Sequence, residues 1–193
     1  LMAFKNGDID WCDVSADMLT QYSNDPDVKD CITLYNTLGV HFVNLNLQSD
    51  NLKDVKVREA LSLAIDRQAL IDNTLSGAGE PAGCWLAPAT PGQDDSAKLD
   101  YDPEKAKQLL AEAGVSNLTL DAKIRKGQYE KYMTVIQSYW AEIGVTLNLT
   151  VEDTGVWQSD WADGNLEVTA LGWFPLYADA DNHMYTYFYS ENA

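Results

Sequence analysis

The sequence predicts an α/β fold, in which helices pack on a sheet. After residue 50, segments with helical periodicity alternate with segments whose apolar residues recur at every second position. The chain has 193 residues, of which 46% are hydrophobic and 22% are charged, so it can bury one sizeable core. Both observations point to α/β layers rather than to a disordered or purely helical chain.

The charge balance excludes two classes of partner. Lys and Arg number 13 and Asp and Glu number 30, which gives a formal net charge of −17. Nucleic acids and anionic lipids both bind clustered cations, so we expect no nucleic-acid partner and no docking on anionic lipid. No run of about 18 apolar residues predicts a membrane span. Both chain ends resemble cuts in a longer polypeptide, because neither has a start or stop signal of its own.

The first fifty residues predict short elements. A helical turn ends at Gly7, a glycine placed to terminate it. Residues 9–12 are expected to form a strand, and Ser15 is the expected N-cap of a helix over residues 16–23. Two further strands are expected, over residues 31–35 and 40–47.

The next fifty residues predict two helices and a long loop. Asp54 can cap the first helix, because apolar residues then recur with a spacing that places them on one face. The second helix runs from Asp66 to a stop at Gly77. Residues 77–100 hold several prolines and glycines, which predict a loop that wraps a surface or has a function.

The remainder continues the alternation of helix and strand. Asp102 and Pro103 are a strong helix start, and Gly114 is an equally clear stop. The expected elements after it are a strand over 118–124, a helix over 128–143, a strand over 145–151, a helix over 156–162 and a strand over 167–174.

The cysteines and histidines predict no metal site. Cys12, Cys31 and Cys84 lack the close spacing of zinc ligands, and the two histidines, His41 and His183, stand apart from them. We interpret both histidines as satisfied or solvated residues. Cys12 and Cys31 either form a disulfide or remain free thiols, and the sequence leaves both alternatives open. No cofactor is expected.

Motifs for catalysis are also missing from the sequence. Residues 77–82 match G-x-G-x-x-A as a string, but they follow a helix, so we interpret them as a loop. There is no phosphate-binding loop, zinc-protease motif or hydrolase elbow. The aromatic residues after 156, including Trp157 and Trp173, either line a ligand cleft or close the edge of a core. No Lys or Arg follows Lys131, so a bound carboxylate would need backbone N–H groups there.

An ordered series of motifs resembles one known family. The motifs are residues 54–67 (DVKVREALSLAIDR), 77–82 (GAGEPA), 101–106 (YDPEKA) with 113–114 (AG), 140–145 (WAEIGV) and 172–173 (GW). In this order they resemble the family 5 extracellular solute-binding proteins of bacterial ABC importers, the peptide/nickel class. The resemblance covers most of the chain.

The resemblance implies a two-lobed receptor outside the cytoplasmic membrane, either periplasmic or a cell-surface lipoprotein. It would close on an oligopeptide or similar solute and deliver it to an ABC permease, without catalysis. The fold implied is the second lobe of a type II periplasmic-binding-protein-like fold, with a mixed sheet flanked by helices. Residues 1–39 would belong to the first lobe and the approach to the hinge, and residues 40–193 would form the second lobe, with the crossing near 40–47.

The resemblance also implies ligand-binding residues. Gly172, Trp173 and Phe174 match the segment that lies along the cleft in peptide-binding members, where backbone groups pair with an extended peptide. Those members place an aspartate a few residues later to hold the α-ammonium of the peptide, and this sequence has Leu176 there. Asp179 or Asp181 would substitute only if the loop shifts. Trp157 is a further candidate for lining the cleft.

Because Leu176 stands where peptide-binding members have an aspartate, other ligands stay possible alternatives. An oligosaccharide stacked on tryptophan, or another non-peptide solute, is the alternative within the family. Two alternative functions belong to other classes of protein. One is a carboxylate-dependent hydrolase, which turnover of a candidate substrate would reveal. The other is a sensory domain, which a neighbouring regulatory domain in the full chain would reveal.

Overall fold

The computed structural model describes residues 1–96, 98–127 and 129–190, so the expected helix start at Gln128 and the last three residues of the chain lie outside it. The chain divides into two compact units. Unit 1 comprises Leu1–Asn36 and Gln68–Pro81, and unit 2 comprises Thr37–Arg67 and Ala82–Ala193. The assignment of residues 1–39 to a first lobe stays a prediction.

Unit 1 consists of short helices and loops. They are α1 (Met2–Lys5), α2 (Ala16–Ser23), the 3-10 turn η1 (Lys29–Cys31) and α4 (Arg67–Leu75), whose first residue belongs to unit 2. Gly7 ends α1 with a φ of 77°, as expected. The bounds of α2 agree with the prediction, although the Ser15 side chain makes no capping hydrogen bond. Lys5 Nζ pairs with Asp25 Oδ2 at 2.6 Å.

The strands predicted at residues 9–12 and 31–35 are wrong. Residues 9–12 form no regular element, and Cys31 ends η1 instead of starting a strand. Ile9, Trp11, Leu34 and Tyr35 are all exposed. A strand is stable when a neighbour pairs its backbone and covers one face, and the described residues offer these segments no such partner. Their alternating apolar residues therefore misled the prediction.

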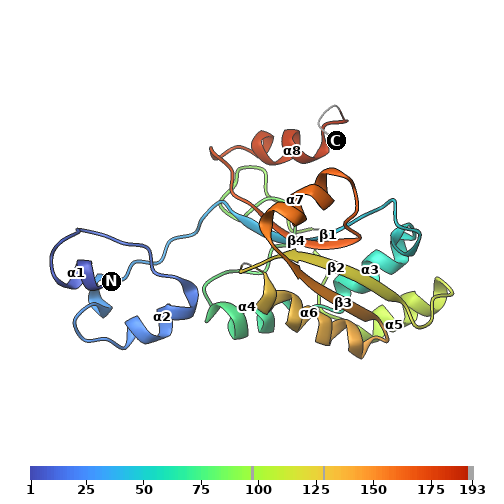
Figure 1. The fold of residues 1–193 in the computed structure, drawn as a ribbon, viewed down its shortest axis with the longest axis horizontal. Helices are drawn as coiled ribbons and strands as arrows, with labels where there is room; N and C mark the ends of the chain where they lie inside the picture. The colour runs from blue at the N-terminus through green and yellow to red at the C-terminus, as the bar shows by residue number, and fades with distance from the viewer. Residues whose placement is uncertain (97, 128, 191–193) are drawn as a thin grey trace. The chain divides into compact units, whose positions relative to one another are not determined.

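Unit 2 is built on a mixed sheet (Figure 1). In the described residues the sheet has four strands in the order β1-β4-β2-β3. The strands are β1 (Val40–Leu45), β4 (Val168–Trp173), β2 (Thr119–Arg125) and β3 (Thr146–Glu152). β1 is antiparallel to β4, whereas β2 is parallel to both β4 and β3. All four were expected from the sequence, with ends that differ by one to two residues.

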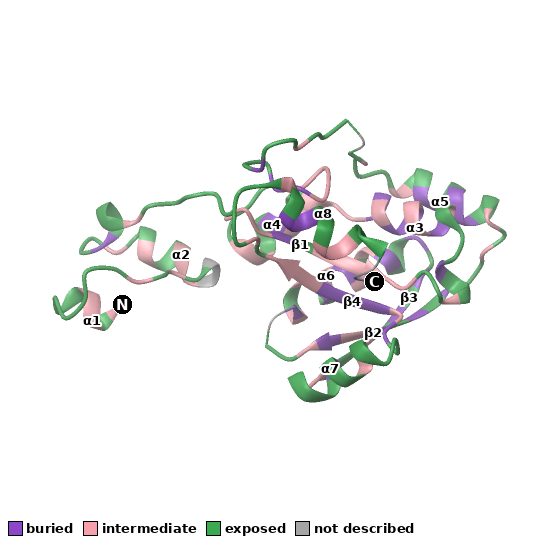
Figure 2. Cartoon of the chain, turned by 90° about the horizontal axis from the view of Figure 1, so that it is seen from above, coloured by how far each residue is buried: buried purple, intermediate pink, exposed green. Residues whose placement is uncertain are grey.

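Helices cover both faces of this sheet. One face carries α3 (Val55–Leu63), α5 (Pro103–Glu112) and α6 (Glu130–Glu142), and the other carries α7 (Thr154–Ala162) and α8 (Ala180–Phe188), as Figure 1 shows. Figure 2 shows that buried residues concentrate on the strands and on the helix faces turned to them. The core includes Leu120, Ala122 and Ile124 of β2, each 0% exposed. The expected α/β fold with a mixed sheet is confirmed.

Local start signals explain the accuracy of the helix predictions. Asp54 Oδ1 accepts a hydrogen bond from Lys56 N at 2.8 Å at the start of α3. Asp102 Oδ1 does the same for Lys105 N at 2.8 Å at the start of α5, where Pro103 occupies the first turn. Each carboxylate satisfies a backbone N–H that would otherwise have no partner within the helix.

The C-terminal helix α8 was not predicted. Three of its nine residues are Tyr or Phe, and aromatic side chains favour helices only weakly. Its N-cap is Asp179, whose Oδ1 accepts a hydrogen bond from Asp181 N at 2.9 Å. Packing stabilises it: the ring of Tyr187 lies 5.2 Å from that of Trp173 and 5.9 Å from that of Phe42.

The cysteines and the long loop complete the fold. Cys12, Cys31 and Cys84 all lie in the described residues and are free thiols, so the disulfide alternative is not realised in this structure.

Residues 77–82 are a loop, as expected, and not the start of a helix. Further along this loop Trp85 packs on the sheet, with its ring centroid 4.2 Å from that of Phe42. No helix in the described part is long and apolar enough to cross a membrane.

Candidate ligand-binding site

The candidate site lies where β4 ends and β1 begins. Because the two strands are antiparallel, Val40 pairs with Trp173 and His41 pairs with Gly172 at this edge of the sheet. β2 and β3 run parallel to β4, so their carboxyl ends point to the same edge. In such sheets ligands commonly bind at the carboxyl ends of the strands.

Gly172 leaves room for two polar side chains. A Cβ atom at this position would lie 2.8 Å from His41 Nδ1 and 2.9 Å from Tyr129 Oη, closer than a real Cβ comes to its neighbours. The absence of a side chain at Gly172 therefore lets the imidazole and the phenol lean over the β4 backbone from β1 and α6. Close approach of this kind is a common reason for a glycine within a strand.

Trp173 points to the opposite face of the sheet and is half-buried. Its Nε1 donates a hydrogen bond to Asn182 Oδ1 at 3.2 Å, and its ring meets that of Tyr187 edge to face. Both partners belong to α8. The indole therefore attaches α8 to the end of β4 and keeps part of its surface accessible.

Phe174 follows β4 and lies on the same face as His41. Its ring is 53% exposed, and its centroid lies 5.4 Å from the imidazole centroid of His41. Its side chain also covers Gly39, where even a methyl group would collide with the phenyl ring. Phe174 therefore offers an accessible ring beside Gly172.

The two candidates further along the loop differ in their surroundings. Leu176 is 91% exposed, the most exposed of the large apolar residues described. Asp179 is exposed too, but its carboxylate already caps α8. Between them Tyr177 Oη donates to Asp181 Oδ2 at 3.1 Å. The acidic groups of this loop are thus engaged in the start of α8.

Trp157 lies apart from these residues, between α7 and the sheet. It is 7% exposed, its Nε1 donates to Thr169 Oγ1 at 3.0 Å, and its ring lies near Trp161 and under Arg125. For Trp157 alone, these contacts favour the alternative that it closes the edge of a core.

His41 is solvated, one of the two alternatives expected for it, whereas His183 departs from its sequence interpretation. His41 is exposed and lies among Tyr129, Tyr132 and Phe174, whose rings partly desolvate the imidazole and lower its pKa below 6.5. His183 is 0% exposed, and neither ring nitrogen has a hydrogen-bond partner among the described residues. It was expected to be satisfied or solvated and is neither, and burial lowers its pKa as well.

The backbone of β4 is paired unevenly. β1 runs along it from Val168 to Trp173, but within the described residues the register with β2 contains a single pair, Ala122 with Val168. From Thr169 onward, the side of β4 that faces away from β1 therefore has no paired strand residue.

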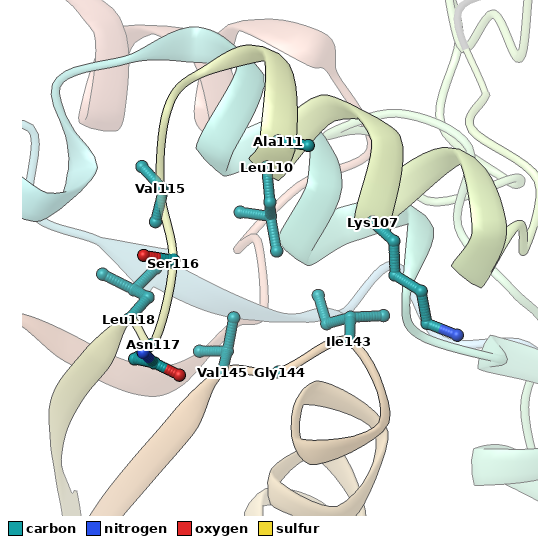
Figure 3. Close-up of a pocket in the computed structure, with 10 residues that line it drawn as sticks. All are labelled: Lys107, Leu110, Ala111, Val115, Ser116, Asn117, Leu118, Ile143, Gly144 and Val145. Carbon is teal, nitrogen blue, oxygen red and sulfur yellow. The ribbon is translucent and has the colours of Figure 1, made fainter.

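A separate pocket of about 220 Å³ lies at the opposite edge of the sheet (Figure 3). Its walls come from the end of α5 and the residues that precede β2 and β3, including Leu110, Leu118, Ile143 and Val145. These strands begin there, whereas β4 ends at the other edge. The described residues contain no group of three or more His, Cys, Asp or Glu side chains placed to hold a metal ion.

The chain as a whole matches one family of binding proteins. The family model described as bacterial extracellular solute-binding proteins, family 5 Middle, matches residues 1–193. The chain belongs to this family, whose members are solute-binding proteins.

Curated relatives carry specific names. The chain is 34% identical over 159 residues to the dipeptide-binding protein of Escherichia coli K12, an alignment that covers 78% of this chain and 30% of that protein. It is 32% identical over 174 residues to heme-binding protein A of Haemophilus influenzae, covering 86% of this chain and 31% of that protein. The chain therefore spans about a third of the length of these relatives.

Solved structures have the same fold. The periplasmic binding protein DppA from Helicobacter pylori, in complex with the peptide STSA, superposes with a TM-score of 0.82 at 25% identity and covers 96% of this chain and 36% of that chain. The substrate-binding protein CtaP from Listeria monocytogenes gives a TM-score of 0.83 at 24% identity, covering 98% and 40%. The latter likeness concerns the fold alone.

Proposed function

We propose that the chain is part of the substrate-binding component of an ABC importer, which captures an oligopeptide or similar small solute between two lobes and delivers it to a permease. The observation that carries this proposal is the family match over residues 1–193. The protein would act outside the cytoplasmic membrane and would bind its solute without transforming it.

The end of β4 supports a peptide as the solute. An extended peptide can add to the side of β4 that lacks a paired strand beyond Val168, with backbone hydrogen bonds for affinity and side-chain contacts for specificity. Gly172 lets His41 and Tyr129 approach the β4 backbone, and Phe174 and Trp173 supply rings on opposite faces of the sheet. These residues, with Leu176 in the loop that follows, are the proposed contacts.

The recognition of the peptide amino terminus should differ from that of ordinary peptide receptors. A charge-assisted hydrogen bond to an ammonium contributes about 1.5–3 kcal/mol. Leu176 cannot make it, and Asp179 already accepts a bond from the backbone of α8. We infer that affinity depends little on a free α-amino group.

A non-peptide solute is the second candidate. One relative is named as a heme-binding protein, and exposed aromatic rings at the β4 end also suit flat or cyclic molecules. Oligosaccharides and other small solutes remain in the test for this reason.

Calorimetric titration of the complete protein tests the proposal. The probes are a mixed di- to hexapeptide library, the same peptides with acetylated amino termini, and neutral oligosaccharides. Saturable binding of both peptide sets is expected. A strict need for the free amine would contradict the inference from Leu176, and binding of sugars alone would replace the peptide by the second candidate.

Two controls accompany the titration. Phe174→Ala should weaken binding, whereas Val156→Ala, which removes an exposed apolar side chain on α7, should not. Mass spectrometry of the peptides after incubation reports turnover. Cleaved peptides would contradict a pure binding function and favour a hydrolase.

A further inference from the structure

Four side chains form a group centred on His41, on the sheet face that carries α6. They are His41, Tyr129, Tyr132 and Phe174, here called the His41 cluster. The imidazole centroid lies 5.4 Å from the ring of Phe174, 5.8 Å from that of Tyr129 and 6.4 Å from that of Tyr132. The contacts with Phe174 and Tyr129 are edge to face, an arrangement that stabilises pairs of aromatic rings.

The cluster is open on one side. Tyr129 is 3% exposed and supports the cluster from within, whereas His41 and Phe174 are exposed. Nδ1 and Cε1 of the imidazole face Gly172, so the rest of that ring is turned away from the β4 backbone. An apolar group placed here would contact the exposed rings of His41 and Phe174 beside the end of β4.

The cluster carries no charge at neutral pH. Among the described residues, the titratable rings in contact with His41 are those of Tyr129, the N-cap of α6, and Tyr132 of α6, while Gly172 and Phe174 do not ionise. Burial raises the pKa of Tyr129, although Arg125 acts on it in the opposite direction. Burial also lowers the pKa of His41 below 6.5, so its imidazole is neutral at pH 7.

We propose that the His41 cluster is a side-chain subsite that selects peptides with an aromatic or large apolar side chain, and that His41 is its specificity-determining residue. The inference rests on the proposed function, because a peptide added along β4 would pass Gly172. The cluster contains neither a carboxylate for a basic side chain nor a cation for an acidic one.

The test measures peptide preference in the complete protein. The probes are trialanine and its derivatives with Phe, Lys or Glu at each position in turn. The wild type should bind the best Phe peptide about tenfold more tightly than the matching Lys peptide, since burial of one ring yields a difference of this order. His41→Phe should keep this preference, and His41→Glu should shift it toward Lys by about tenfold.

A matched control separates local from general charge effects. Ser138→Glu adds the same charge on the exposed surface of α6 and should leave the preference unchanged. Circular dichroism reports folding of each variant. If His41→Glu does not fold, His41→Gln replaces it and should lose most of the preference for Phe, because the amide lacks a ring.

The pH profile gives a second readout. A bound apolar side chain would cover the imidazole and lower its pKa further, so protonation would oppose binding. Affinity of the wild type for the Phe peptide should fall between pH 7.5 and 5.5, whereas His41→Phe should show a flatter profile.

The outcomes separate the two proposals. If the wild type binds none of the tripeptides, the proposed peptide function fails and the subsite fails with it. If it binds them, and the His41 variants keep the same preference and pH profile, the subsite alone is overturned.

Discussion

Trp173 and Asn182 are joined by a hydrogen bond in which the indole Nε1 donates to the amide Oδ1 at 3.2 Å. The bond connects the last residue of β4 to the first turn of α8, and Asn182 is only 9% exposed. It therefore holds the aromatic end of the candidate site against the helix that covers it.

Removal of this acceptor should destabilise the protein. Asn182→Ala leaves the half-buried indole N–H without its partner, which costs about 1–2 kcal/mol of unfolding free energy. Asn182→Gln, which keeps an uncharged amide acceptor, should lose less. Urea unfolding measures both, with Asn148→Ala as the control because its hydrogen bond to Asp121 is exposed. Equal losses at positions 182 and 148 would contradict a special role for this bond.

Gly172→Ala should change binding more than it changes folding. The new methyl group would meet Nδ1 of His41 at 2.8 Å and Oη of Tyr129 at 2.9 Å, so both side chains must move. Because they are side-chain atoms, the backbone can stay in place. We expect the affinity for a bound peptide to fall about tenfold, measured by calorimetry. The control is Gly155→Ala on α7, where the added Cβ meets nothing within 4 Å. Unchanged affinity would show that peptide binding does not depend on the positions of His41 and Tyr129 over Gly172.

The sequence predicted the features that depend on neighbouring residues and missed those that depend on contacts between distant segments. Asp54 and Asp102 were found from the sequence because a cap acts on residues two or three positions away. The false strand over residues 9–12 had the right local pattern and lacked a partner strand, which no local pattern reveals. The helix α8 was missed for the opposite reason, since contacts of Tyr187 with Trp173 and Phe42 stabilise it.

In the candidate site too, the sequence predicted neighbouring residues and missed distant ones. Gly172, Trp173 and Phe174 are consecutive, so one motif pointed to all three. Their surroundings include His41, Tyr129 and Tyr132, which lie at least 40 residues away in the sequence, and His41 was therefore interpreted as an ordinary histidine. The antiparallel register that places it opposite Gly172 was the missing information.

The N-cap of α5 should contribute measurably to stability. Asp102→Ala removes the acceptor for Lys105 N and should cost about 1 kcal/mol. Asp153 is a matched control: it is also an N-cap aspartate, on α7, but its side chain makes no capping hydrogen bond. Asp153→Ala should cost less than half as much in the same thermal or urea unfolding experiment. If Asp153→Ala lowered the free energy of unfolding more than Asp102→Ala, charge near the helix start would matter more than the hydrogen bond.

The ion pair between Lys123 and Asp160 should make stability depend on pH. Lys123 Nζ bonds Asp160 Oδ2 and lies 3.7 Å from Glu152 Oε1, which ties β2 to α7 and β3. The hydrogen bond from Lys123 lowers the pKa of Asp160 below 3.8, and the same bond raises the pKa of Lys123 above 10.5. Asp160 therefore stabilises the fold above its unfolded pKa, and this contribution disappears as the pH falls through its lowered folded pKa. Lys123 contributes below its unfolded pKa and loses this contribution as the pH rises through its raised folded value.

The pH dependence can be isolated with one substitution. Asp160→Asn should lower the urea midpoint at pH 7, and the difference from wild type should shrink steadily as the pH approaches 2.5, because protonated Asp160 no longer pairs with Lys123. Asp163→Asn, at the C-cap of the same helix, measures the general effect of removing one negative charge from a chain with a net charge of −17. After that subtraction, a difference that is constant from pH 7 to pH 2.5 would show that the carboxylate of Asp160 contributes through packing and not through its charge.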